Sequence, residues 1–145
     1  MPEKETLERA RKDKREGKAA STQAGEFVRE EIDHIREGKH GARSTKQAIA
    51  IGLSKARRAG VDLPPSETAS EETKEQAKRD LRKGSKRSTK KSRKRSRATL
   101  TALRREGRSA ATKRALSRQA RGAAKKRSAK SRSRSAKKAA ATRKK

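Results

Sequence analysis

Positive charge is concentrated in one half of this chain, and that asymmetry limits what each half can fold into more than any other feature. Residues 81–145 hold 28 Lys and Arg and one acidic residue, whereas residues 1–80 hold 18 basic and 16 acidic residues. Because like charges at this density repel one another in a compact state, we expect a folded core only in the first half. With 27% hydrophobic residues and Phe27 as the single aromatic residue, that core must be small.

Glycine and proline divide the first half of the chain into three segments. Residues 1–20 are polar, and their marginal helix is expected to end at Gly17. Residues 21–63 are predicted to form a small helical hairpin. Residues 64–84 start with two prolines and are predicted to form a charged helical connector, capped by Thr68, which we expect to be solvated because it has almost no apolar face.

The first hairpin helix is predicted over residues 22–37, with Ser21 or Thr22 as its N-cap and Gly38 as its stop. Its apolar residues recur at helical spacing and share one stripe, which a single acid, Glu31, interrupts. The core residues predicted from this stripe are Phe27, Val28, Ile32 and Ile35.

The second hairpin helix is predicted over residues 45–59. Ser44 and Gln47 form a capping-box pattern at its start, and Gly60 followed by Val61 matches a glycine C-cap with its hydrophobic contact. These two signals favour a helix over the strand that the local alternation of Ala and Ile would also suit.

The two faces of this second helix suggest two different contacts. On a helical wheel Ile49 and Leu53 lie beside Gly52, which would let a neighbouring backbone approach closely. Ile51 points the other way. Because a hairpin of this size seldom folds without help, we expect Ile51 to contact a second copy of the chain or a protein partner.

The second half of the chain is a low-complexity sequence of Lys, Arg, Ser and Ala. We expect residues 85–145 to be a disordered tail that binds nucleic acid, so the fold class predicted for the chain is mostly α-helical with extensive disorder. The predicted phosphate-binding cations are Lys86, Arg87, Lys90, Lys91, Arg93, Lys94, Arg95, Arg97, Arg104, Arg105, Arg108, Lys113, Arg114, Arg118, Arg121, Lys125, Lys126, Arg127, Lys130, Arg132, Arg134, Lys137, Lys138, Arg143, Lys144 and Lys145.

The composition favours double-stranded DNA as the partner, bound without sequence preference. Single-strand binding normally needs aromatic stacking platforms, and Phe27 is already assigned to the core. RNA or the ribosome is one alternative, and a protein adaptor built on the hairpin is another. The hairpin itself could be a DNA-binding helix-turn-helix that uses Lys46, Lys55, Arg57 and Arg58, or a packing or dimerisation module. The acidic first helix and the long loop favour the second interpretation.

Catalysis and metal chemistry find little support in the sequence. There is no phosphate-binding glycine loop, no dinucleotide fingerprint and no plausible nucleophile-base pair, so we expect neither an enzyme nor a cofactor. His34 lies four residues after Glu30, a ligand-like spacing, but one such pair is weak and we expect no metal site. Without cysteines, a signal peptide or a long apolar run, the protein is expected to be cytoplasmic and nucleoid-associated.

One stretch resembles a known group of proteins. Residues 44–64, STKQAIAIGLSKARRAGVDLP, resemble a motif of small, basic, largely uncharacterised bacterial proteins, some of them labelled plasmid stabilisation protein. The tail is similar in composition to the C-terminal arms of linker histones and of bacterial histone-H1-like nucleoid proteins. The resemblance implies a bacterial origin and association with the nucleoid or a plasmid, and it brings no catalytic residues.

Overall fold

The computed structural model describes residues 1–86 and 92–143, and within these ranges every regular element is a helix and none is a strand. The mostly α-helical fold predicted from the sequence is confirmed. None of the helices in these ranges has the length and apolarity needed to cross a bilayer. The elements are α1 (Lys4–Arg15), α2 (Ala20–Arg36), α3 (Thr45–Arg58), α4 (Glu71–Ser85), α5 (Arg93–Arg104), the 3-10 turn η1 (Ser109–Ala111), α6 (Lys113–Lys126) and α7 (Ala129–Arg143).

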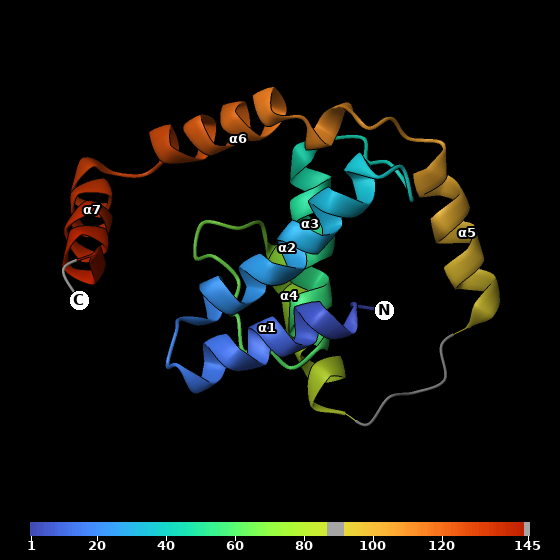
Figure 1. The fold of residues 1–145 in the computed structure, drawn as a ribbon, viewed down its shortest axis with the longest axis horizontal. Coiled ribbons are helices and arrows are strands. Elements are labelled where there is room, and N and C mark those ends of the chain that lie inside the picture. Colours follow the sequence, from blue (N-terminus) through green and yellow to red (C-terminus); the bar gives the residue numbers. More distant parts are fainter. Residues whose placement is uncertain (87–91, 144–145) are drawn as a thin grey trace.

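The first four helices pack together, and the last three run around their outside (Figure 1). α2 and α3 form the predicted hairpin, α1 packs against α2, and α4 packs against α3. α6 crosses near the start of α3, while α5 and α7 extend away on either side of it.

The ends of the hairpin helices follow local signals, with one exception. The Ser44 hydroxyl accepts a hydrogen bond from the Gln47 N–H at 3.2 Å, which confirms the predicted cap of α3. Gly60 has a φ of 93°, and the Val61 N–H donates to the Ala56 carbonyl at 3.1 Å, as in a Schellman motif. The cap predicted for α2 is wrong because this helix starts earlier, at Ala20, whose side chain packs into the core.

The hairpin closes tightly because α3 turns small side chains toward α2. Gly52 is buried, and a Cβ atom there would lie 2.7 Å from the Val28 Cα atom, so the predicted close approach at this glycine is confirmed. Phe27, Ile32 and Ile35 are buried, and Val28 and Leu53 pack at the edges of two core clusters.

The two isoleucines of α3 lie outside those clusters. Ile49 is half-buried rather than a core residue, because the fully buried positions of α3 are the small ones nearest α2. Ile51 is also half-buried. It shares a side of α3 with Ser54 and Arg58, and both of these bond to Asp80 of α4 at 2.7 and 2.8 Å. The side of α3 assigned to a partner therefore faces α4 of the same chain.

α1 and α4 are more closely packed than their composition predicts. Thr6 and Ala10 of α1 are 0% and 5% exposed against α2. In α4, Ala77 and Asp80 are each 1% exposed, so this helix is a packed element and not a solvated connector. The N-cap of α4 is Ser70, two residues after the predicted Thr68. The backbone of Ser70 is extended, which allows its hydroxyl to accept a hydrogen bond from the Thr73 N–H.

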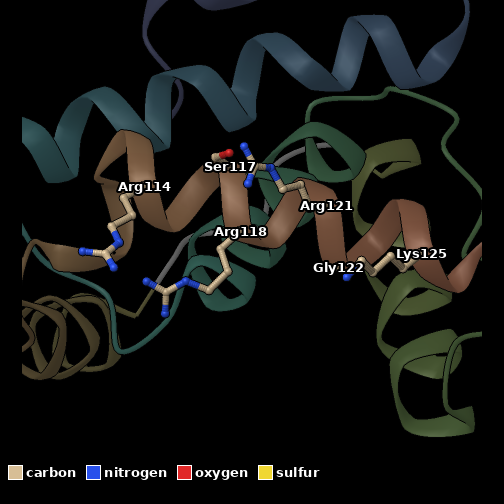
Figure 2. Close-up of a pocket in the computed structure, with 6 residues that line it drawn as sticks. All are labelled: Arg114, Ser117, Arg118, Arg121, Gly122 and Lys125. Atoms are coloured by element: carbon tan, nitrogen blue, oxygen red, sulfur yellow. The ribbon is translucent and has the colours of Figure 1, made fainter.

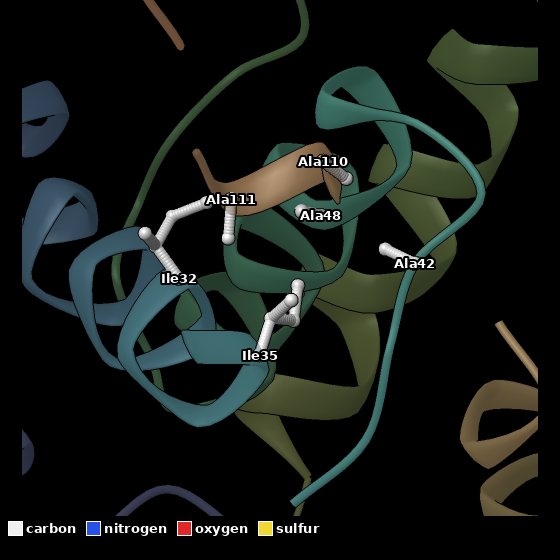
Figure 3. Packing of buried hydrophobic residues seen from close by; sticks show 6 residues of the cluster. All are labelled: Ile32, Ile35, Ala42, Ala48, Ala110 and Ala111. Carbon is white, nitrogen blue, oxygen red and sulfur yellow. The ribbon is translucent and has the colours of Figure 1, made fainter. Parts of the chain in front are cut away.

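The extensive disorder predicted for residues 85–145 is not what the structure shows. Residues 92–143 are largely helical, and η1 contributes to the core: Ala110 and Ala111 are 5% and 0% exposed. Figure 3 shows both alanines gathered with residues of α2, of the α2–α3 loop and of α3. The cluster consists of Ile32, Ile35, Ala42, Ala48, Ala110 and Ala111.

Backbone hydrogen bonds fasten this part of the tail to the α2–α3 loop. The Gly41 N–H donates to the Leu103 carbonyl at 2.9 Å, and the Ala42 N–H donates to the Gly107 carbonyl at 3.1 Å. A Cβ atom at position 41 would lie 2.0 Å from the Glu106 carbonyl oxygen, so only glycine fits there. We call residues 103–112 the docking segment.

Two side chains of the hairpin hold the far end of the docking segment. The Thr45 hydroxyl donates to the Ala110 carbonyl at 2.7 Å, and the Arg36 Nε–H donates to the Ala111 carbonyl at 3.0 Å. Because these bonds reach backbone carbonyls, the segment needs no distinctive side chains of its own. Within the docking segment the buried residues are Ala110 and Ala111.

Candidate nucleic-acid interface

α6 carries a continuous cationic face. Arg114, Arg118, Arg121 and Lys125 fall within an arc of about 60° at 100° per residue. All four are exposed, and together with Ser117 and Gly122 they line a hollow along this one helix (Figure 2). The four cations therefore form one row that a polyanion can contact along its length.

The opposite side of α6 fixes the helix on the hairpin. Leu116 packs against the core cluster that holds Ala111, and Ala115 and Gln119 are half-buried. The Thr112 hydroxyl caps the helix by accepting the Ala115 N–H at 3.2 Å. The docked residues Ala115, Gln119 and Leu116 lie about 90°, 130° and 170° around the helical wheel from the centre of the cationic face, so docking leaves the cations exposed.

Ion pairing separates the two halves of the molecule. In the described part of the chain, every ion pair joins groups between Glu3 and Asp80. The described cations of residues 92–143 form no ion pair with any acidic residue in the described part of the chain. The second half thus keeps its positive charge uncompensated and available to phosphate groups.

The structure places the predicted phosphate-binding cations on the outside of the molecule. Arg87, Lys90, Lys91, Lys144 and Lys145 lie outside the described residues. All of the others are exposed: Lys86 after α4, Arg93, Lys94, Arg95, Arg97 and Arg104 on α5, Arg105 and Arg108 in the docking segment, Lys113, Arg114, Arg118, Arg121, Lys125 and Lys126 on α6, Arg127 after it, and Lys130, Arg132, Arg134, Lys137, Lys138 and Arg143 on α7.

The cations considered for a helix-turn-helix mostly serve the hairpin itself. Lys55 lies 2.6 Å from the Glu31 carboxylate, and Arg58 lies 2.8 Å from Asp80. The Arg57 Nε–H donates to the Leu63 carbonyl at 2.9 Å, and burial lowers the pKa of its guanidinium, partly offset by the charge of Asp80. These contacts favour the packing-module interpretation of the hairpin.

The carboxylate of Asp80 is the buried charge that joins α4 to α3. It accepts hydrogen bonds from Ser54, Arg58 and Gln76 at 2.7, 2.8 and 3.3 Å. Burial by itself would raise the pKa of Asp80, but the hydrogen bonds from Ser54 and Arg58 and the charge of Arg58 outweigh burial, and the pKa is lowered.

Both histidines lie in a cluster that sequence reasoning missed. Glu30, four residues before His34, instead accepts the Glu3 N–H at 3.1 Å. It is Glu31 that approaches the histidines: one ligand atom each from Glu31, His34 and His40 lie within 4.8 Å of one another. The Glu-x-x-His spacing of Glu31 and His34 was the available signal, and His40 joins them only through the fold of the loop.

Comparison with known proteins gives one match. Residues 4–67 match the model of DUF6496, a family of unknown function, so α1, α2 and α3 are similar to that family. No curated protein and no solved structure matches the chain. The similarity ends before α4 begins, and it does not include the docking segment or the cationic face of α6.

Proposed function

We propose that this protein is a non-enzymatic, sequence-independent DNA-binding protein that neutralises backbone phosphates with its C-terminal helices. The observation that carries the proposal is the row of exposed cations on α6, in a half of the molecule whose described cations have no acidic partner. In this proposal the hairpin is a platform that holds α6 in place. The cellular setting we propose is the cytoplasm, in association with the nucleoid or a plasmid.

The dimensions of α6 suit a phosphate backbone. From Arg114 to Lys125 the helix rises about 16 Å at 1.5 Å per residue. Duplex DNA carries about one charge per 1.7 Å of its axis, so phosphates are available along the whole row. Contacts of this kind position a protein on DNA without reading bases, which supports binding that is indifferent to sequence.

The burial of Phe27 in the core favours duplex DNA over single-stranded DNA as the partner. Phe27 is the only aromatic residue of the chain and is 1% exposed, so no aromatic ring is available for stacking on bases. Folded RNA presents the same phosphates, and RNA or ribosome binding is therefore the competing outcome of the experiment below.

The adaptor alternative has less support. Among the described residues the large hydrophobic side chains that are exposed are Met1 and Leu100, so the hairpin offers no broad apolar surface to a partner. Self-association through residues 21–63 stays a prediction, for which the half-buried Ile51 is a weak contact.

The experiment compares two variants of equal net charge in the full-length protein. The first changes Arg114, Arg118, Arg121 and Lys125 to Gln. The control changes four exposed cations of α1 to Gln: Lys4, Arg11, Lys14 and Arg15. Affinity for two unrelated DNA duplexes is measured by fluorescence anisotropy between about 50 and 300 mM salt, because the slope of log affinity against log salt reports the number of phosphates engaged.

We expect the α6 variant to lower the magnitude of that slope by about 3–4 on both duplexes and the α1 control to change it by less than about 1. Equal losses in the two variants would mean that net charge alone binds DNA and would contradict the role of α6. A strong preference for one duplex would contradict sequence independence. Displacement from DNA by ribosomal RNA at far below equal mass would favour the RNA alternative.

A further inference from the structure

The cluster of Glu31, His34 and His40 is a group of nitrogen and oxygen ligands on the hairpin, away from the cationic face of α6. Glu31 is 0% exposed, His40 is 9% exposed, and the His34 side chain is 14% exposed. We propose that these three side chains bind one zinc ion. The argument for this site does not rest on the proposed DNA binding.

The hydrogen bond of the His40 ring determines what faces Glu31. His40 Nδ1 lies 3.0 Å from the Gly41 carbonyl oxygen, which can only accept, so Nδ1 carries a proton. In the neutral ring, Nε2 then presents a lone pair, and it lies 3.1 Å from a Glu31 carboxylate oxygen. Two acceptors at that distance repel each other unless a cation or a second proton lies between them.

The Glu31 carboxylate is short of partners for a buried charge. Both of its oxygens are buried and neither has a hydrogen-bond partner of good geometry. Lys55 Nζ is 2.6 Å from one oxygen and also 3.5 Å from Glu30, which is itself 4% exposed. One lysine thus faces two buried carboxylates. The Glu31 oxygen nearest His40 is not the one that Lys55 contacts, so a second cation could bind to it.

The surroundings of the histidines resemble the outer shell of metal sites. A ligating histidine normally donates its second ring N–H to a backbone carbonyl or a carboxylate, as His40 does toward Gly41. His34 Nε2 lies 2.8 Å from a Glu3 carboxylate oxygen, which also contacts Lys39 at 3.1 Å. Glu3 is therefore placed to orient the His34 ring as an outer-shell carboxylate does.

The ligand set selects the metal. Two imidazoles and one carboxylate suit zinc, whereas magnesium and calcium prefer sites built of oxygen atoms. Zinc binds such atoms at about 2.0–2.2 Å, so ligand atoms about 3–3.5 Å apart surround it, and Nε2 of His40 and the Glu31 oxygen already have that separation. The fourth position would be taken by water.

Zinc at this place would join α2 to the loop that follows it. Glu31 and His34 belong to α2, whereas His40 belongs to the loop, so the ion would restrain the loop against the helix. A site that forms only in the folded chain stabilises that fold by an amount that rises with the logarithm of metal concentration over Kd, so stability is a readout that needs no activity.

The experiment uses the untagged, full-length protein, stripped of metal and then titrated with zinc chloride. Zinc content after dialysis, isothermal titration calorimetry and Tm are measured for the unchanged chain, for His40→Gln, for His34→Gln and for the matched surface control Glu67→Gln. His40→Cys, which restores a zinc ligand, separates loss of a ligand from loss of structure, and circular dichroism checks that each variant is folded.

We expect one zinc per chain and a rise in Tm of roughly 10 °C at a hundredfold excess over Kd. Affinity should fall by about 10- to 100-fold or more in either glutamine variant and recover in His40→Cys, with Glu67→Gln unchanged. About one-tenth of an equivalent or less, or equal binding by all variants, would overturn the proposal. It would also be overturned if NMR showed a doubly protonated His40 at pH 7.5 that zinc does not alter.

Discussion

The two halves of this molecule are both helical, but different forces keep them so. In residues 1–86 the helices bury one another, and ion pairs balance their charges. In residues 92–143, α5, α6 and α7 contain no buried residue, and the docking segment makes most of the contact with the hairpin. The difference teaches that helical content alone does not reveal which part of a chain is held by packing.

Phe27 provides the largest test of this comparison. Phe27→Ala should lower the free energy of unfolding by about 3–5 kcal/mol, because Phe27 is the largest fully buried side chain. Leu100→Ala on α5 should change it by less than about 0.5 kcal/mol, since Leu100 is 38% exposed. Urea unfolding followed by circular dichroism measures both. Comparable losses would mean that the second half is packed as tightly as the first.

Two helical glycines give a smaller test, with effects of opposite sign. Gly52→Ala should cost about 2–3 kcal/mol, because the new Cβ atom would lie 2.7 Å from the Val28 Cα atom. Gly122 has nothing within 4 Å of an added Cβ atom, so Gly122→Ala should raise the helicity of α6 by the equivalent of about 0.5–1 kcal/mol. Thermal melts and circular dichroism report the two effects. Stabilisation by Gly52→Ala would show that α2 and α3 are not in close contact.

Asp80 supplies the smallest test, through pH. Its pKa is lowered on folding from an ordinary value of 3.8, so its contribution to stability is complete above about pH 5 and is lost progressively as the pH falls through the lower, folded pKa. Asp80→Asn should cost about 1–2 kcal/mol at pH 7 and progressively less in acid. The exposed Asp62→Asn is the control, and Tm is measured from pH 2 to 7. A difference between the variants that stays constant with pH would contradict the role of the carboxylate.

The sequence predicted those parts of the fold that depend on neighbours along the chain. The hairpin helices were predicted because Ser44, Gly60 and the stripe around Phe27 are local signals. The burial of α4 was not predicted. Asp80 reads as a surface residue until Ser54 and Arg58 are brought to it by the fold.

The docking segment and the histidine cluster show the same limit. Ala110 and Ala111 resemble the other alanines of a low-complexity tail, and only the space beside Ile35 makes them core residues. His40 lies nine residues from Glu31, and no periodicity relates them. The cations of α6 were all predicted individually, but their alignment on one face follows only once that helix is known to form.

Gly41 lies between the histidine cluster and the docking segment and is hydrogen-bonded to both. Its carbonyl accepts a hydrogen bond from Nδ1 of the His40 ring, and its N–H donates to the Leu103 carbonyl of the docking segment. Thermodynamic linkage makes such a connection reciprocal. If zinc binding at the His40 ring favours docking of residues 103–112 by some factor, docking raises the affinity for zinc by the same factor. In that case a polyanion that drew residues 103–112 away from the loop would lower the affinity of His40 and its neighbours for zinc.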